Sequence, residues 1–284
     1  MPGDPETSQR APATASDPRA RARQAILATC LVYGGYTVLG FVPVLRDLRQ
    51  LALIAAFYFL PGVLLRREPA VAERYQVGPD SPIPRWSWRG LKVAAIACAV
   101  LFPPFVLGFF WFYGQVCAGH LDVVAPVVWL EGWTPLAGGL EEYLARLCRP
   151  HAGALLPEVL RLPLAWREWG GLGFLSEVAI GLFTVALAEE VFHRGYLMSA
   201  LEERWPPRRT ILGVPFGLAA VLSSLLFAVG HLVSMVQIGR LATFFPSLVF
   251  AWLWRRSGSL WAPALFHLAA NLLMDALLAT TFPR

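Results

Sequence analysis

The chain has 284 residues, of which 56% are apolar and only 15% are charged, and its mean hydropathy is +0.53. Soluble domains carry about 25% charged residues, so this composition excludes an ordinary soluble domain, a disordered chain and a disulfide-rich secreted module. The net charge of +5 does not require nucleic acid as a partner, because excess positive charge in a membrane protein marks cytoplasmic loops and lipid headgroup contacts. We therefore expect an all-α, polytopic helix bundle in a lipid bilayer.

Residues 1–24 are rich in proline, alanine, serine and threonine, which predicts a disordered cytoplasmic tail. The apolar segments that follow are candidates for transmembrane helices, each of which needs about 20 mainly apolar residues. The seven predicted spans are 25–45, 51–65, 91–112, 172–200, 211–237, 241–254 and 260–280. The segments 51–65 and 241–254 are short and could instead be re-entrant.

Arginines are distributed unevenly among the predicted loops. Most of them lie in the segments 1–24, 66–90, 201–210 and 255–259. By the positive-inside rule these segments and the N-terminus are cytoplasmic, and the long loop 113–171 lies outside. Within this loop, Gly139–Cys148 is amphipathic and is expected to lie on the membrane surface as an interfacial helix. The predominance of arginine over lysine is typical of GC-rich bacterial genomes, so we expect a bacterial inner (cytoplasmic) membrane protein.

The four cysteines have no CxxC or Cys/His zinc spacing. Cys30 and Cys98 lie inside apolar spans. Cys117 and Cys148 both fall in the long loop, and they can form a disulfide only if that loop lies outside the cytoplasm. The sequence leaves open whether they pair.

Ionisable side chains inside the predicted spans are the most informative residues. A charge at the centre of a bilayer costs roughly 2.5–3.5 kcal/mol on insertion scales, so function is the default interpretation of such residues. In the fourth, fifth and seventh spans these polar residues are Glu189, Glu190, His193, Arg194, His231, His267, Asn271 and Asp275. Three of the five histidines of the chain are among them.

The spacing of these residues predicts a shared polar pocket. Glu190 and Arg194 are four residues apart, so they can pair on one helical face, and His267 and Asn271 share a face in the same way. If these faces turn inward, the bundle collects carboxylates, imidazoles and an amide. That set suffices for hydrolysis, because a carboxylate can take a proton from water while an imidazole orients it. A second imidazole and an amide can donate hydrogen bonds to the oxyanion.

The depth of the pocket depends on where the fifth span begins. Glu189 lies roughly 20 Å along its helix from the cytoplasmic end at Arg204. If the fifth helix began near Arg209, His231 would lie about 25–30 Å from that cytoplasmic end. A tilted fifth helix, or one that begins later than Ile211, would bring the two side chains to a common depth.

Three motifs follow one another on three apolar spans: EExxxR at residues 189–194, FxxxH at Phe227–His231 and HxxxN at His267–Asn271. In this order they resemble the CAAX prenyl protease and bacteriocin-processing (CPBP, or Abi) family of intramembrane peptidases. The resemblance covers about residues 170–280. It implies a catalytic transmembrane domain at 170–284, preceded by N-terminal helices and the extracytoplasmic loop at 25–169.

The resemblance also implies a role for each motif residue. Glu189 would be the general base that activates water, assisted by His231. His267 and Asn271 would stabilise the oxyanion of the tetrahedral intermediate. The activity implied is an endopeptidase that cuts near the end of a membrane-anchored protein or peptide, as CAAX proteases and peptidases of C-terminal sorting tails do, with no cofactor.

Other residues near the motifs would support the site. Glu190 and Arg194 would pair, or hold Glu189 and the substrate in position, and Phe227 would pack beside the site. His193 stands at an unspecified motif position and is expected to be a bystander or a supporting residue. Asp275 is outside the motifs and is expected to make a structural polar contact near the helix end.

A second EExxxR string, Glu141 to Arg146, shows that the string alone is a weak signal. Its surroundings are polar and amphipathic, so a surface pair between Glu142 and Arg146 explains it, and no function is required. The apolar context therefore selects Glu189 rather than Glu141.

Three other functions remain open on the sequence. In a metallopeptidase variant, Glu189, His231 and His267 would hold zinc in the three-ligand pattern of catalytic sites, although no HExxH is present. An intramembrane ion or proton transporter would use the same buried groups, although no inverted repeat is visible. A catalytically inactive immunity or scaffold protein would keep the family fold without its chemistry.

Overall fold

The computed structural model of the chain describes residues 17–78, 82–125, 138–149, 161–167, 171–235 and 237–281. The helices before the long central helix are α1 (Pro18–Phe41), α2 (Arg49–Leu64), α3 (Pro69–Tyr75), α4 (Trp88–Cys117), α6 (Gly138–Cys148) and α7 (Leu164–Arg167). The central helix runs through α8 (Leu172–Ile180), η2 (Gly181–Ala186), α9 (Leu187–Glu190), η3 (Val191–Met198) and α10 (Ser199–Arg204). The remaining elements are β1 (Arg209–Ile211), β2 (Val214–Phe216), α11 (Leu218–Ser234), η4 (Ile238–Thr243), α12 (Phe244–Ser257) and α13 (Trp261–Thr281).

The prediction of an all-α membrane helix bundle is confirmed. Within the described ranges, four helices are long and apolar enough to cross a membrane: Pro18–Phe41, Trp88–Cys117, Leu172–Arg204 and Trp261–Thr281. Two shorter apolar helices, α2 and α11, accompany them. The described strands are β1 and β2, which pair antiparallel in a short hairpin before α11.

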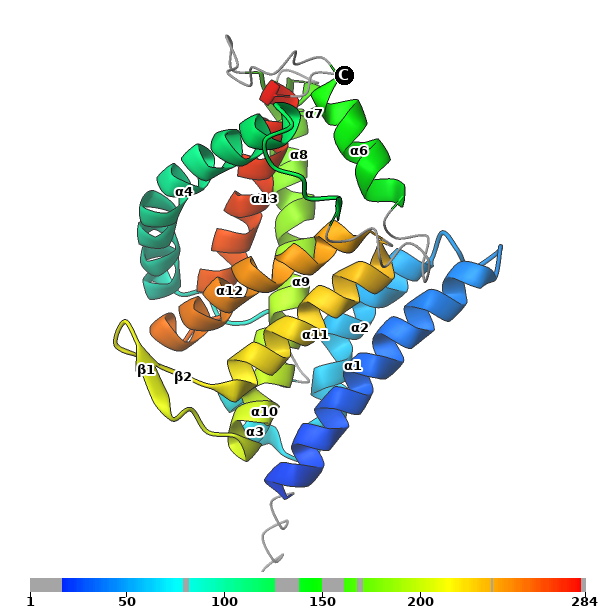
Figure 1. Cartoon of the computed structure of the whole chain (residues 1–284). Helices are drawn as coiled ribbons and strands as arrows, with labels where there is room; N and C mark the ends of the chain where they lie inside the picture. Colours follow the sequence, from blue (N-terminus) through cyan, green and yellow to red (C-terminus); the bar gives the residue numbers. More distant parts are fainter. Residues whose placement is uncertain are drawn as a thin grey trace, which may run out of the picture.

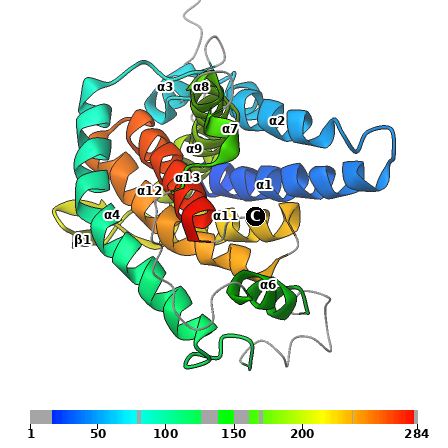
Figure 2. The same ribbon diagram turned by 90° about the horizontal axis from the view of Figure 1, so that it is seen from above.

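The helices surround the central helix Leu172–Arg204 (Figure 1). All eight residues of its segment η3 are buried, and α1, α2, α11 and α12 pack against that segment. α13 packs against α9, and α4 curves around the outer side of α13 (Figures 1 and 2). The curvature of α4 is explained by Pro103 and Pro104 in its interior, since proline removes a helix hydrogen bond and clashes with the preceding turn.

The first helix begins at Pro18, inside the segment 1–24 that the sequence assigns to a tail. Asp17 caps it by accepting a hydrogen bond from the Arg19 amide, and proline is favoured at a first helical position. Arg21 is buried and forms ion pairs with Glu68 and Glu203. These contacts fix the helix start, and the predicted disorder is wrong for this part of the segment. Residues 1–16 lie outside the described residues.

The fifth apolar helix begins later than its apolar run in the sequence. Residues Arg209–Phe216 form the hairpin, so α11 begins at Leu218 rather than near Ile211. His231 is then roughly 20 Å from the start of its helix, the same as the roughly 20 Å between Glu189 and Arg204 at the end of α10. Of the two alternatives that the sequence left open, a tilted fifth helix or a later start, the structure shows the later start.

Cys117 and Cys148 form a disulfide that joins the end of α4 to the end of α6. The sequence left open whether these two cysteines pair, and the structure shows that they do. Cys30 and Cys98 are free. α6 is the amphipathic segment that the sequence predicts within the long loop.

Candidate active site

Glu189 and Glu190 lie on α9, between the π-helical segments η2 and η3. A π-helical segment departs from the regular helical ladder, and such departures are frequent at functional sites. The side chain of Glu190 is fully buried, whereas that of Glu189 is 16% exposed. The two neighbouring carboxylates therefore meet different surroundings.

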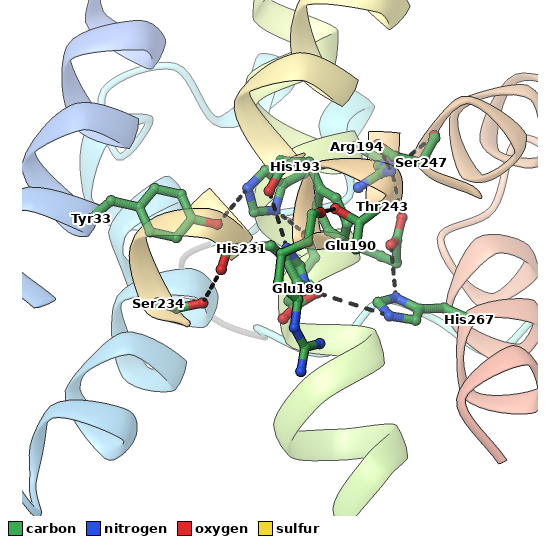
Figure 3. Close-up of polar contacts among 12 residues, drawn as sticks. Tyr33, Glu189, Glu190, His193, Arg194, His231, Ser234, Thr243, Ser247 and His267 are labelled. Atoms are coloured by element: carbon green, nitrogen blue, oxygen red, sulfur yellow. Dashed lines mark hydrogen bonds and ion pairs between the residues drawn. The ribbon is translucent and has the colours of Figure 1, made fainter. Parts of the chain in front are cut away.

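Two imidazoles from other helices face the Glu189 carboxylate (Figure 3). Glu189 Oε2 lies 3.8 Å from His231 Nε2 on α11 and 3.9 Å from His267 Nε2 on α13. These separations exceed a direct hydrogen bond, and a shared water molecule is one way in which polar groups at such distances interact. The structure thus brings together three of the predicted site residues from three separate helices.

The hydrogen bond of His231 fixes the position of its ring proton. Its Nδ1 lies 3.1 Å from the carbonyl oxygen of Phe227, one turn earlier in α11. A carbonyl oxygen only accepts, so Nδ1–H donates, and in the neutral ring Nε2 is then an acceptor. This acceptor nitrogen is the one directed at Glu189.

His267 is held by the second carboxylate. Its Nδ1 donates to Glu190 Oε1 at 3.2 Å, and its ring stacks on Phe250 with centroids 4.6 Å apart and planes inclined by 20°. His267 Nε2 is therefore left free to face Glu189. Glu190 acts here as the group that orients an imidazole, a task that carboxylates commonly perform.

Arg194 balances the buried charge of Glu190. Its Nε lies 3.1 Å from Glu190 Oε2, and both side chains are fully buried. Its Nη2 donates to the backbone oxygen of Ser247 at 3.0 Å and to the Ser247 hydroxyl at 2.6 Å. The guanidinium also lies 4.7 Å from the ring centroid of Phe227 and 5.1 Å from that of Phe250, within the range of cation–π attraction.

Phe227 is buried at the centre of these groups. Its ring centroid is 4.4 Å from that of His231 and 6.1 Å from that of His267. It lies beside the site, where the sequence places it.

Asn271 and Asp275 do not contact this cluster. Both are exposed, on the turns of α13 that follow His267. In the described part of the chain Asn271 forms no hydrogen bond to the other site residues, so its role in oxyanion binding stays a prediction. Asp275 also stays outside the contacts described above.

The second EExxxR string lies on α6, away from the central helix (Figure 1). Glu141 and Glu142 are exposed there. The side chain of Arg146 lies outside the described residues, so the predicted pair with Glu142 is not tested.

Three residues of the site belong to no motif, and the sequence does not predict them. Ser247 and Phe250 on α12 contact Arg194 and His267, and Tyr33 on α1 contacts His193. No spacing in the sequence distinguishes them from other serines and aromatic residues of apolar helices. Their contacts join positions that are far apart in the chain.

Among the described residues, no group of three His, Cys, Asp or Glu side chains is arranged to hold a metal ion. The three zinc ligands considered from the sequence, Glu189, His231 and His267, are not such a group. One nitrogen of each imidazole already donates a hydrogen bond, to a backbone carbonyl or to Glu190.

The fold and the site together define a polytopic membrane protein with an acid–imidazole cluster inside its helix bundle. Residues 171–273 match the family of type II CAAX prenyl endopeptidases described as Rce1-like. The match spans all three motifs, agrees with the resemblance to CAAX proteases that they carry, and indicates an intramembrane protease. No curated protein and no solved structure matches the chain.

Proposed function

We propose that the protein is a glutamate-dependent intramembrane endopeptidase in which Glu189 activates water. The observation that carries the proposal is the approach of Glu189 to two imidazoles at 3.8 and 3.9 Å inside an apolar bundle. A water molecule between Glu189 and His231 would donate one hydrogen bond to each. Both acceptors are present, because Nδ1 of His231 carries the ring proton.

In this reaction the water oxygen attacks the carbonyl carbon of the scissile peptide bond, and Glu189 takes the proton that the water loses. The carbonyl oxygen becomes an oxyanion. When the tetrahedral intermediate collapses, the C–N bond breaks and Glu189 returns the proton to the leaving amine. His231 keeps the attacking water oriented throughout.

The oxyanion would be stabilised by His267. In that role its Nδ1–H would donate to Glu190 and a proton on Nε2 would donate to the oxyanion. Two carboxylates, Glu189 and Glu190, would then be balanced by the cations of His267 and Arg194, which limits the cost of burying charge. Asn271, on the next turn of α13, would supply a second donor once substrate is bound.

The substrate would be a membrane-anchored protein or peptide cut near one of its ends. A site within a bundle of apolar helices is reached most directly by a chain that is itself held in the bilayer. The substrates we consider are proteins cut in the manner of CAAX substrates and proteins with a C-terminal sorting tail. The enzyme would reside in a bacterial inner membrane.

Membrane proteomes test this proposal even while the substrate is unidentified. Cells that produce the wild-type protein are compared with cells that produce Glu189→Gln at equal level, and terminal peptides are quantified. We expect one or a few anchored proteins to be shortened only with the wild-type enzyme. Identical terminal peptides in both strains would contradict the proposal.

The proposed reaction uses no metal ion, in contrast to the zinc variant built on Glu189, His231 and His267. Metal analysis of the purified protein, combined with cleavage of the identified substrate in a strong chelator, separates the two. We expect full activity in chelator and no stoichiometric zinc. Loss of activity that zinc restores would favour the metallopeptidase.

A further inference from the structure

We infer that Tyr33 of α1 is a positioning residue for the acid–imidazole pair Glu189 and His231. The inference rests on the proposed function. Tyr33 is buried, with 8% of its surface exposed, and it contacts both chain segments that carry these two side chains. It lies outside the residues 171–273 that match the protease family.

The first contact leads from Tyr33 to Glu189 through His193 (Figure 3). The Tyr33 hydroxyl lies 3.1 Å from His193 Nε2, and His193 Nδ1 lies 2.9 Å from the backbone oxygen of Glu189. The carbonyl can only accept, so Nδ1–H donates to it, and Nε2 of the neutral ring accepts from the tyrosine. Tyr33 thereby selects the tautomer of His193 that binds the Glu189 backbone.

The surroundings of His193 make this short chain of hydrogen bonds specific. The ring is fully buried, and the centroids of Phe57, Phe192 and Phe227 lie 5.4, 5.2 and 5.0 Å from its own. Apolar rings offer no competing hydrogen bond. In such an environment a hydrogen bond is stronger than in water, and the loss of one leaves a buried polar group without a partner.

The second contact leads from Tyr33 to His231 through Gly230. A Cβ atom at residue 230 would clash with Cζ and the hydroxyl oxygen of Tyr33, so no other side chain fits there. Only glycine lets the tyrosine ring rest against the backbone of α11 at this point. Gly230 directly precedes His231, so the ring sets how closely α1 and the His231 turn approach.

Tyr33 thus acts on both sides of the 3.8 Å separation between Glu189 and His231. The Glu189 side is held by the Tyr33 hydroxyl through His193, and the His231 side by the phenol end of the ring against Gly230. A displacement of about 1 Å between catalytic groups can lower a rate by roughly 100-fold. The N-terminal helix therefore completes a site whose motif residues all come from the C-terminal part of the chain.

The variant Tyr33→Phe tests the inference, since it removes the hydroxyl and keeps the ring. The full-length protein is reconstituted in proteoliposomes, and the probe is the membrane protein found shortened in the proteome comparison. We expect kcat to fall roughly 10- to 100-fold with KM changed by less than about twofold. In a His193→Leu background, Tyr33→Phe should cause no further loss, because both changes break the same chain.

Tyr36→Phe is the matched control. Tyr36 is a buried tyrosine on the same helix, its ring lies against the Arg49 guanidinium, and wild-type kinetics are expected. A readout independent of substrate is the ¹⁵N spectrum of the histidines. We expect His193 to show the Nδ1-protonated tautomer in the wild type, and its Nε2 resonance to move toward that of an unbonded acceptor in Tyr33→Phe.

An unchanged kcat for Tyr33→Phe, an unchanged Nε2 resonance, or an equal loss with and without His193 would overturn the inference. Glu189→Gln in the same assay separates this failure from that of the proposed function. If Glu189→Gln is inactive and Tyr33→Phe is fully active, only the role of Tyr33 is refuted. If Glu189→Gln cleaves normally, the proposed mechanism fails and the inference fails with it.

Discussion

Buried serines of this protein differ in how much their hydroxyl groups contribute to stability. Ser247 and Ser224 are both buried serines on apolar helices. The hydroxyl of Ser247 accepts a hydrogen bond from the charged Arg194, whereas that of Ser224 has no partner among the described residues. Removing a partner from a buried charge is costly, while removing an unsatisfied hydroxyl is not.

We therefore predict that Ser247→Ala lowers the free energy of unfolding by roughly 1–3 kcal/mol. Ser224→Ala should be neutral or slightly stabilising. Thermal unfolding of the two variants in the same detergent measures the difference. Equal melting temperatures would show that the Ser247 contact does not stabilise Arg194.

At the scale of single residues, the sequence predicts some members of the site and not others. Glu189, Glu190, Arg194, His231 and His267 are found by motif and by the cost of placing them in a membrane, and the structure gathers them. Tyr33 and Ser247 cannot be found in this way. A tyrosine or serine in an apolar helix carries little insertion cost, and its partner is defined only by tertiary packing.

At the scale of elements, the positions of the helices follow from hydropathy, and their ends do not. The seven predicted apolar segments all correspond to helices. The start of α1 depends on the Asp17 cap and on ion pairs of Arg21, and the start of α11 depends on the β1–β2 hairpin. A cap, a hairpin turn and an ion pair between segments are set by specific polar groups, so a hydropathy profile does not contain them.

The disulfide between α4 and α6 gives a prediction at the same scale. Maleimide labelling of the denatured protein should add two adducts without reductant, at Cys30 and Cys98, and four after reduction. Intact mass measures both numbers. Four adducts in the absence of reductant would contradict the bond between Cys117 and Cys148.

In the whole molecule, α1 begins at one end of the bundle and α13 ends at the opposite end (Figure 1). In a bilayer whose normal follows the central helix, the start of α1 and the end of α13 would lie on opposite sides. Disulfides persist in oxidising compartments, so the bond between Cys117 and Cys148 favours an extracytoplasmic loop. The arginine distribution independently favours a cytoplasmic N-terminus.

We therefore predict that the N-terminus is cytoplasmic and the C-terminus is not. Alkaline phosphatase fused after residue 284 should be active, and the same enzyme fused after residue 85, which lies between α2 and α4, should be inactive. Phosphatase activity in intact cells at matched expression is the measurement. The reverse pattern would invert the orientation of the whole bundle.

The central claim is that Glu189 and the two imidazoles act on one water molecule. The most direct test is the cleavage rate of Glu189→Gln, in proteoliposomes, against the wild type and against Glu141→Ala on α6. We predict a loss of roughly 1,000-fold or more for Glu189→Gln, because an amide cannot take the proton of water, with unchanged insertion and unfolding temperature. Glu141→Ala should cleave at the wild-type rate. Cleavage by Glu189→Gln at the wild-type rate would contradict the role of Glu189 in activating water.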